Sequence, residues 1–85
     1  MTFCVVLSAN ARDTLRKLNK DISERIIKRL EQIRSDPYLY VKSLQGVELF
    51  SLRVGDYRVL MDIKKGKMII FVVKIGHRKA VYDEL

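Results

Sequence analysis

The pattern of hydrophobic and polar positions predicts a strand followed by a helix at the start of the chain. Residues 2–7 form a short apolar and β-branched run that ends at Ser8, which is typical of a strand buried on both faces. Ser8 then suits the N-cap of a helix over residues 9–18, because apolar residues recur there at helical spacing.

A second helix is predicted to follow directly. Asp21, with Glu24 three residues later, forms a capping-box-like signal at its start. Asp36-Pro37 ends it, because the residue before a proline disfavours helical geometry. The apolar stripe of this helix comprises Ile22, Ile26, Ile27, Leu30 and Ile33.

The second half of the chain changes to the pattern of strands. Three runs rich in Val, Ile, Phe and Tyr cover residues 47–54, 57–63 and 68–75. Gly55-Asp56 and residues 64–67 separate them as hairpin turns, which predicts an antiparallel meander. The order β-α-α-β-β-β therefore predicts an α+β fold in one domain over residues 1–85. It is a two-layer sandwich with a two-helix hairpin packed on a small, mainly antiparallel sheet.

Composition adds a large positive charge to this plan. The chain has 17 Lys or Arg and 10 Asp or Glu, for a net charge of +7. Residues 42–79 hold nine of the cations and three of the acids, so the sheet half should meet a polyanion or an acidic partner. One Cys and one His cannot form a disulfide or a four-ligand zinc site. We expect a cytoplasmic protein without a metal, a cofactor or a membrane span.

The predicted hairpin brings two arginines together. If residues 55–56 form a two-residue turn, Arg53 lies directly opposite Arg58, on the face away from the helices. Like charges opposite each other destabilise a hairpin. Two explanations stay open: nearby carboxylates neutralise the pair, or both arginines bind one phosphate through bidentate geometry. The carboxylates in question are Glu48, Asp56 and Asp62.

A second cluster follows the last predicted strand, where residues 76–82 read Gly-His-Arg-Lys-Ala-Val-Tyr. Metal-free cleavage of RNA through its own 2′-OH requires a base, an acid and cations that stabilise the phosphorane. His77 and Tyr82 can move protons and Arg78 can stabilise charge, so the cluster is a candidate for this chemistry. Each residue also has a structural explanation. His77 could cap the end of the strand, the ring of Tyr82 could pack on the core, and Arg78 could bond the acidic tail at Asp83 and Glu84.

These two strings resemble the RelE/ParE superfamily of type II toxins. The first, with R-x-G-D-Y-R, covers residues 52–60, and the second, H-R-x-x-x-Y, ends at Tyr82. The upstream strand, helical hairpin and Leu44-Gln45-Gly46 agree with the resemblance, which spans nearly the whole chain. In the RelE branch the resemblance implies a ribosome-dependent endoribonuclease, which cuts mRNA without a metal and so inhibits translation. It also implies two partners: the ribosome with its RNAs, and a RelB-like antitoxin that forms a hetero-oligomer with the toxin.

The resemblance implies roles for individual residues. Arg58 and Arg78 would hold the scissile phosphate, Tyr82 would stack on a base or transfer a proton, and His77 would be a general acid or base. The residues implied to bind RNA are Arg53, Lys42 and Lys79.

The chain departs from the best-studied branch at two positions. That branch has two lysines where this sequence has Leu49 and Ser51, and one of them is proposed as the general base. Proton transfer would then pass to His77, Tyr82, Lys42 or Lys79. Two alternatives follow: a non-enzymatic inhibitor of DNA gyrase, as in the ParE branch, or a decayed toxin that acts only as a binding module.

Overall fold

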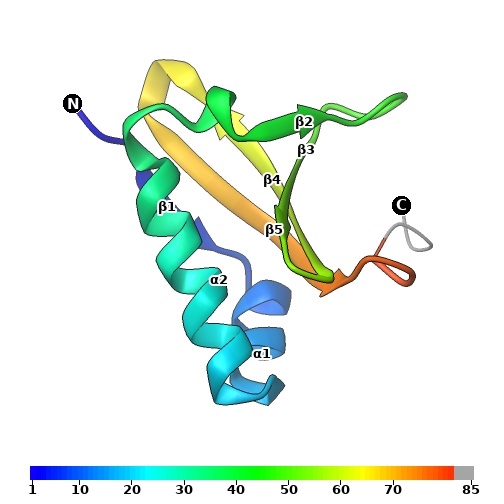
Figure 1. The fold of residues 1–85 in the computed structure, drawn as a ribbon. Helices are drawn as coiled ribbons and strands as arrows, with labels where there is room; N and C mark the ends of the chain where they lie inside the picture. Colours follow the sequence, from blue (N-terminus) through cyan, green and yellow to red (C-terminus); the bar gives the residue numbers. More distant parts are fainter. Residues whose placement is uncertain (82–85) are drawn as a thin grey trace.

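The computed structural model describes residues 1–81 and has two helices on one face of a five-stranded sheet (Figure 1). The helices are α1 (Ala9–Lys17) and α2 (Lys20–Gln32). The strands are β1 (Cys4–Leu7), β2 (Val41–Ser43), β3 (Phe50–Val54), β4 (Tyr57–Lys64) and β5 (Ile69–His77). Short 3-10 helices cover Ile33–Ser35, Pro37–Leu39 and Lys65–Lys67. The predicted α+β sandwich with two helices on one layer is confirmed.

The strand order in the sheet is β1-β5-β4-β3-β2. Strands β3, β4 and β5 form the predicted antiparallel meander, and β1 pairs with β5 in parallel. Strand β2, which adds to β3, lies between the predicted second helix and the first of the three predicted strands, where the sequence pattern predicts neither a helix nor a strand. The prediction that the first strand is buried on both faces is wrong. β1 is an edge strand covered by helices on one side only, so Cys4 is exposed and Val6 keeps 40% of its surface.

Both helices begin at side-chain caps. Ser8 caps α1 as predicted, since its hydroxyl oxygen accepts a hydrogen bond from the Ala11 N–H at 3.0 Å. The cap of α2 is Asn19 rather than Asp21, because its side-chain oxygen accepts from the Asp21 N–H and the helix starts at Lys20. Ile27, predicted in the apolar stripe, is 49% exposed.

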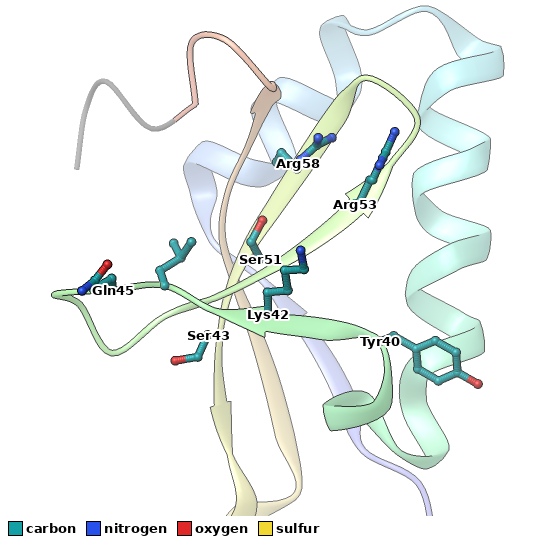
Figure 2. Close-up of a pocket in the computed structure, with 8 residues that line it drawn as sticks. Tyr40, Lys42, Ser43, Gln45, Ser51, Arg53 and Arg58 are labelled. Carbon is teal, nitrogen blue, oxygen red and sulfur yellow. The ribbon is translucent and has the colours of Figure 1, made fainter.

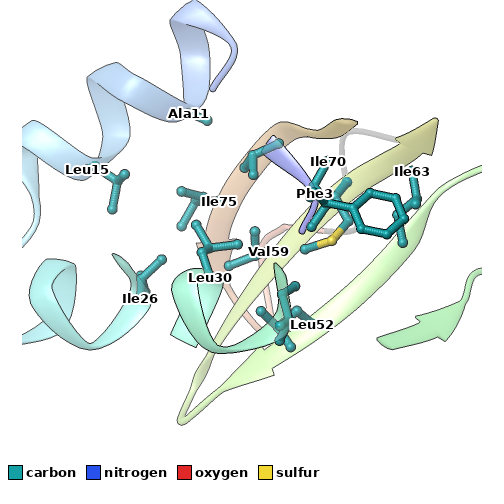
Figure 3. Packing of buried hydrophobic residues seen from close by; sticks show 13 residues of the cluster. Phe3, Ala11, Leu15, Ile26, Leu30, Leu52, Val59, Ile63, Ile70 and Ile75 are labelled. Atoms are coloured by element: carbon teal, nitrogen blue, oxygen red, sulfur yellow. The ribbon is translucent and has the colours of Figure 1, made fainter. Parts of the chain in front are cut away.

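The hydrophobic core fills the space between the helices and one face of the sheet (Figure 3). Alternate residues of each strand point into it, as the two-residue period of a strand requires. Its fully buried members are Ala11, Ile26, Ile33, Leu52, Val59, Met61, Ile70 and Val72, and Leu30 and Ile75 are nearly so. On the opposite face of the sheet no helix lies among residues 1–81, and we refer to it as the helix-free face (Figure 1).

A bulge in β5 decides which residues reach the helix-free face. Met61 pairs with Val72 and Leu60 with Lys74, so Val73 has no partner on β4. The extra residue reverses the alternation of side chains along the rest of β5. The Ser8 hydroxyl donates a hydrogen bond to the Val73 carbonyl at 2.7 Å and so ties the bulge to the start of α1.

Candidate functional site

The β3–β4 hairpin has the predicted register. Gly55 and Asp56 form its turn, with Gly55 at a φ of 59° that favours glycine. Arg53 pairs with Arg58 across the two strands. Leu52 and Val59, each next to one of these arginines in the chain, are buried in the core, so both arginines lie on the helix-free face.

A hollow of about 410 Å³ opens beside this pair, and we name it the strand hollow. Its lining residues are Tyr40, Lys42, Ser43, Leu44, Gln45, Ser51, Arg53 and Arg58. Strand β2 supplies Lys42, which pairs with Ser51 of β3. Figure 2 shows Lys42, Ser51 and the two arginines side by side on neighbouring strands, with the ring of Tyr40 pointing away. Three cations thus line the hollow together with Ser51, a residue that is only 8% exposed.

Arg58 is held in place by backbone carbonyls. One terminal nitrogen of its guanidinium donates to Gly55 O at 3.1 Å and to Tyr57 O at 3.0 Å. Among residues 1–81 the other N–H donors of the guanidinium have no acceptor, so they can bind a ligand. A fixed, half-buried guanidinium of this kind is well suited to binding a phosphate oxygen.

No carboxylate among residues 1–81 forms an ion pair with Arg53 or Arg58. Asp62 pairs instead with Lys64 at 3.0 Å. At Asp56 the Arg78 N–H donates to the backbone carbonyl at 2.8 Å, a bond that does not involve the carboxylate. The first of the two explanations that the sequence left open was neutralisation of the pair by Glu48, Asp56 or Asp62. The structure contradicts it, since none of these carboxylates forms an ion pair with either arginine among residues 1–81. The pairing of two guanidiniums leaves this end of the face strongly positive.

The C-terminal segment folds back over the helix-free face. Its Arg78 backbone is anchored to the β3–β4 turn by the bond to Asp56, and the Val81 N–H donates to His77 O at 2.9 Å. Val81 is 1% exposed and packs on Gly76, where an added Cβ would come within 3.1 Å of the Val81 side chain. Because Gly76 pairs with Arg58, this segment lies beside the arginines. Tyr82 lies outside the described residues.

His77 is separated from the strand hollow by the sheet itself. It pairs with Tyr57, whose side chain packs against the core, and the two rings meet edge to face at 5.7 Å. The Nδ1 atom of His77 accepts from the Lys79 N–H at 3.4 Å, and Lys79 is exposed in the turn after β5. The register therefore directs His77 to the opposite side from Arg58.

The sequence prediction missed Lys74. This residue pairs with Leu60, which pairs with Ser51, so Lys74 lies in the same cross-strand row as Lys42. Without the bulge at Val73 it would have faced the core, and the continuous apolar run gave no signal of the bulge. Within residues 1–81, no three His, Cys, Asp or Glu side chains are grouped to hold a metal ion. None of the helices in this part of the chain is long and apolar enough to cross a membrane.

A helical hairpin on one face of a sheet, with cations and a hydroxyl on the other, is the arrangement of a small basic protein with an open, positively charged strand surface. Comparison with known proteins gives its family. The sequence model described as ParE toxin of type II toxin–antitoxin system, parDE, matches residues 5–82. The chain belongs to this family of toxins and is RelE-like.

Individual relatives cover almost the whole chain. The mRNA interferase toxin RelE of Escherichia coli K12 is 26% identical over 89 aligned positions, which cover 99% of this chain and 94% of that protein. Among solved structures, the RelBE2 toxin–antitoxin complex of Mycobacterium tuberculosis contains a chain with a TM-score of 0.85 and 25% identity. The match covers 92% of this chain and 100% of the chain from Mycobacterium tuberculosis. The archaeal RelE–RelB complex of Pyrococcus horikoshii matches with a TM-score of 0.80 at 24% identity, over 95% and 100% of the two chains.

Proposed function

We propose that this toxin is a ribosome-dependent endoribonuclease that cuts mRNA in the cytoplasm and so inhibits translation. The observation that carries the proposal is the Arg53–Arg58 pair, which lines the strand hollow with Lys42 and Ser51 and has no carboxylate partner among the described residues. The similarity to the mRNA interferase RelE supports the same reaction.

In this reaction the 2′-oxygen of a ribose attacks the adjacent phosphorus and the bond to the 5′-oxygen breaks. One proton leaves the attacking hydroxyl and another reaches the departing oxygen. Arg58, fixed by two carbonyls, stabilises the negative charge that develops on the phosphorane oxygens, and Arg53 adds a second guanidinium. Arg78, anchored beside the turn, contributes a third.

Lys42 is the best candidate for proton transfer among the described residues. It lines the strand hollow opposite Ser51, a position where the RelE branch carries a lysine on β3 itself. His77 faces the helix side and Lys79 lies in the turn beyond β5. An amine supplied from β2 would thus replace the missing amine of β3, and Tyr82 would stack on a base.

Cleavage of message on translating ribosomes, with purified toxin and primer extension, tests the proposal. We expect Arg58→Ala to reduce the cutting rate about 100-fold or more, because it removes the fixed charge at the phosphate. Lys65→Ala, at the other end of β4, should cut at the wild-type rate. The same assay with Lys42→Gln and His77→Gln assigns proton transfer, with the loss expected for Lys42 only. Ribosome binding by wild-type toxin without any cutting would refute the nuclease and favour a decayed toxin.

We further propose that a RelB-like antitoxin neutralises this chain in a hetero-oligomer. The relative of known structure from Mycobacterium tuberculosis is in a toxin–antitoxin complex. An apolar hollow of about 240 Å³ lies between the helices and β1, lined by Val5, Leu7, Leu15, Ile27, Leu30 and Glu31. It offers an anchor for the apolar side of an amphipathic antitoxin segment.

Inhibition of DNA gyrase is the second candidate, and the ParE description of the matching family favours it. A gyrase inhibitor would block supercoiling by purified gyrase and leave translation unaffected. The nuclease would do the reverse, so the two assays run side by side separate the candidates.

A further inference from the structure

A second positive hollow lies on the other side of the β3–β4 hairpin, against α2. It measures about 290 Å³ and we name it the helix hollow. Four cations line it, Arg25, Lys28, Arg29 and Arg53, and no Asp or Glu is among its described lining residues. The Arg25 guanidinium reaches the turn itself, since a Cβ on Gly55 would lie 3.3 Å from it.

None of the acids of the two helices forms an ion pair with these four cations among residues 1–81. Asp13 pairs with Lys17 at 3.1 Å, Glu24 with Lys20 at 3.9 Å and Glu31 with Arg34 at 2.8 Å. Asp21 and Glu24 border Arg25 and Lys28 in an adjacent hollow, but neither forms an ion pair with them in the described part of the chain. Like charges three and four residues apart on one helix face repel each other, so an anion that lies between them is stabilised.

The helix hollow is continuous with the strand hollow. Arg53 lines both of them. Arg29 lies near the edge of the strand hollow, because its guanidinium is 5.0 Å from the ring of Tyr40, a lining residue whose ring points away from Lys42 and Ser51 (Figure 2). Arg53 thus joins the positive surface that begins at Lys42 to the cations of α2.

The lining favours a nucleic acid over an acidic protein as the occupant. Protein interfaces depend on buried apolar and aromatic anchors. Apart from its cations, the described lining of this hollow consists of Gln32, Val54 at the end of β3 and Gly55 of the turn. Phosphate backbones are instead bound by rows of Lys and Arg without apolar anchors.

We propose that the helix hollow is a second RNA site, in which Arg25, Lys28 and Arg29 bind phosphates of an RNA backbone that passes Arg53. This rests on the proposed function for the identity of the polyanion. The RNA is either the message beyond the cut or ribosomal RNA beside it. The site adds affinity and orientation, while the strand hollow holds the reacting phosphate.

The test compares two double variants that lose the same charge. Arg25→Gln with Lys28→Gln removes two cations of the helix hollow, and Lys65→Gln with Lys67→Gln removes two exposed cations at the far end of β4 and β5. Affinity is measured from about 50 to 200 mM salt for empty ribosomes and for a short 2′-O-methyl oligoribonucleotide, which cannot be cut. Thermal unfolding checks that both variants fold.

We expect the first variant to lower the slope of log affinity against log salt by about 1.4, since each lost contact with a single strand removes about 0.7. The control should leave the slope within about 0.3 of wild type. A loss with both probes identifies a single strand that continues from the strand hollow, and a loss with ribosomes alone identifies ribosomal RNA; either result supports the site.

Equal slopes for the two double variants on both probes overturn the proposal. Unchanged RNA slopes with weaker binding of poly-L-glutamate also overturn it and identify a surface for an acidic protein. Because binding is read without cleavage, the outcome is independent of the nuclease. A wild-type chain that cuts no message but shows the slope loss would refute the proposed function and leave the second RNA site standing.

Discussion

The two faces of the β3–β4 hairpin are built from alternate residues of the same strands and have opposite chemistry. Leu52 and Val59 are fully buried under the helices, whereas Arg53 and Arg58, their neighbours in the chain, lie on the helix-free face. One face contributes apolar burial and the other brings like charges together, which opposes folding. The hairpin therefore holds a destabilising cluster of cations on a stabilising core.

This difference predicts that stability and RNA chemistry separate residue by residue. A substitution on the core face should change the free energy of unfolding and leave the chemistry of the folded fraction intact. A substitution of Arg53 or Arg58 should do the reverse, whereas Leu60, although it lies on the helix-free face, is itself fully buried. Single substitutions on each face, with matched controls, test this separation.

The largest effect on stability is expected from Leu52→Ala. Leu52 is 0% exposed in the core, and truncating a buried leucine removes its transfer free energy and leaves a cavity. The free energy of unfolding should fall by about 2–5 kcal/mol, as measured by urea denaturation. Leu39→Ala, at a leucine 74% exposed, is the matched control and should change it by less than about 0.5 kcal/mol. Similar losses for both would show that the two faces do not divide the stability as proposed.

Ser8→Ala tests the link between the faces. The substitution removes the N-cap bond to Ala11 and the bond to the Val73 carbonyl in the bulge. We expect a loss of about 1–2 kcal/mol in the free energy of unfolding. Amide exchange should also quicken at residues 74–76, because the bulge loses its anchor.

Ser23→Ala is the control for this prediction. The Ser23 hydroxyl also donates to a carbonyl, Lys20 O at 3.0 Å, but it lies on an exposed helix surface. It should be nearly neutral. Faster exchange at residues 74–76 in both variants, or in neither, would contradict the proposed role of Ser8.

The two hairpins differ in how much of them the sequence reveals. The β3–β4 register follows from a two-residue turn at Gly55-Asp56, so the pairing of Arg53 with Arg58 was predicted and is confirmed. The β4–β5 register depends on the bulge at Val73, which the Ser8 hydroxyl stabilises from a distant part of the chain. The local pattern of residues gives no information about a hydrogen bond between two residues as far apart in the sequence as Ser8 and Val73. The predicted hairpin between the last two strands therefore lacked the bulge.

The same limit applies to the prediction of the functional site. Candidates on β3 and β4 could be predicted, whereas the direction of every residue after Val73 could not. The bulge sends Lys74 and Gly76 to the helix-free face and His77 to the other, although His77 and Arg78 are adjacent in the sequence. Strand β2 was also missed, because three residues are too few for a periodic signal, and with it the position of Lys42 opposite Ser51.

The smallest effect is expected from Arg53→Gln, and it has the opposite sign. Removing one of two facing guanidiniums relieves like-charge repulsion, so the free energy of unfolding should rise by a few tenths of a kcal/mol at low salt. The gain should vanish near 1 M salt, where the Debye length is only about 3 Å. Arg58→Gln removes the same charge but also the bonds to Gly55 O and Tyr57 O, so it should stabilise less. Urea denaturation of both variants at two salt concentrations decides the point. A loss of stability in Arg53→Gln at low salt would mean that the pair is already compensated, and the positive cluster would then no longer argue for a bound phosphate.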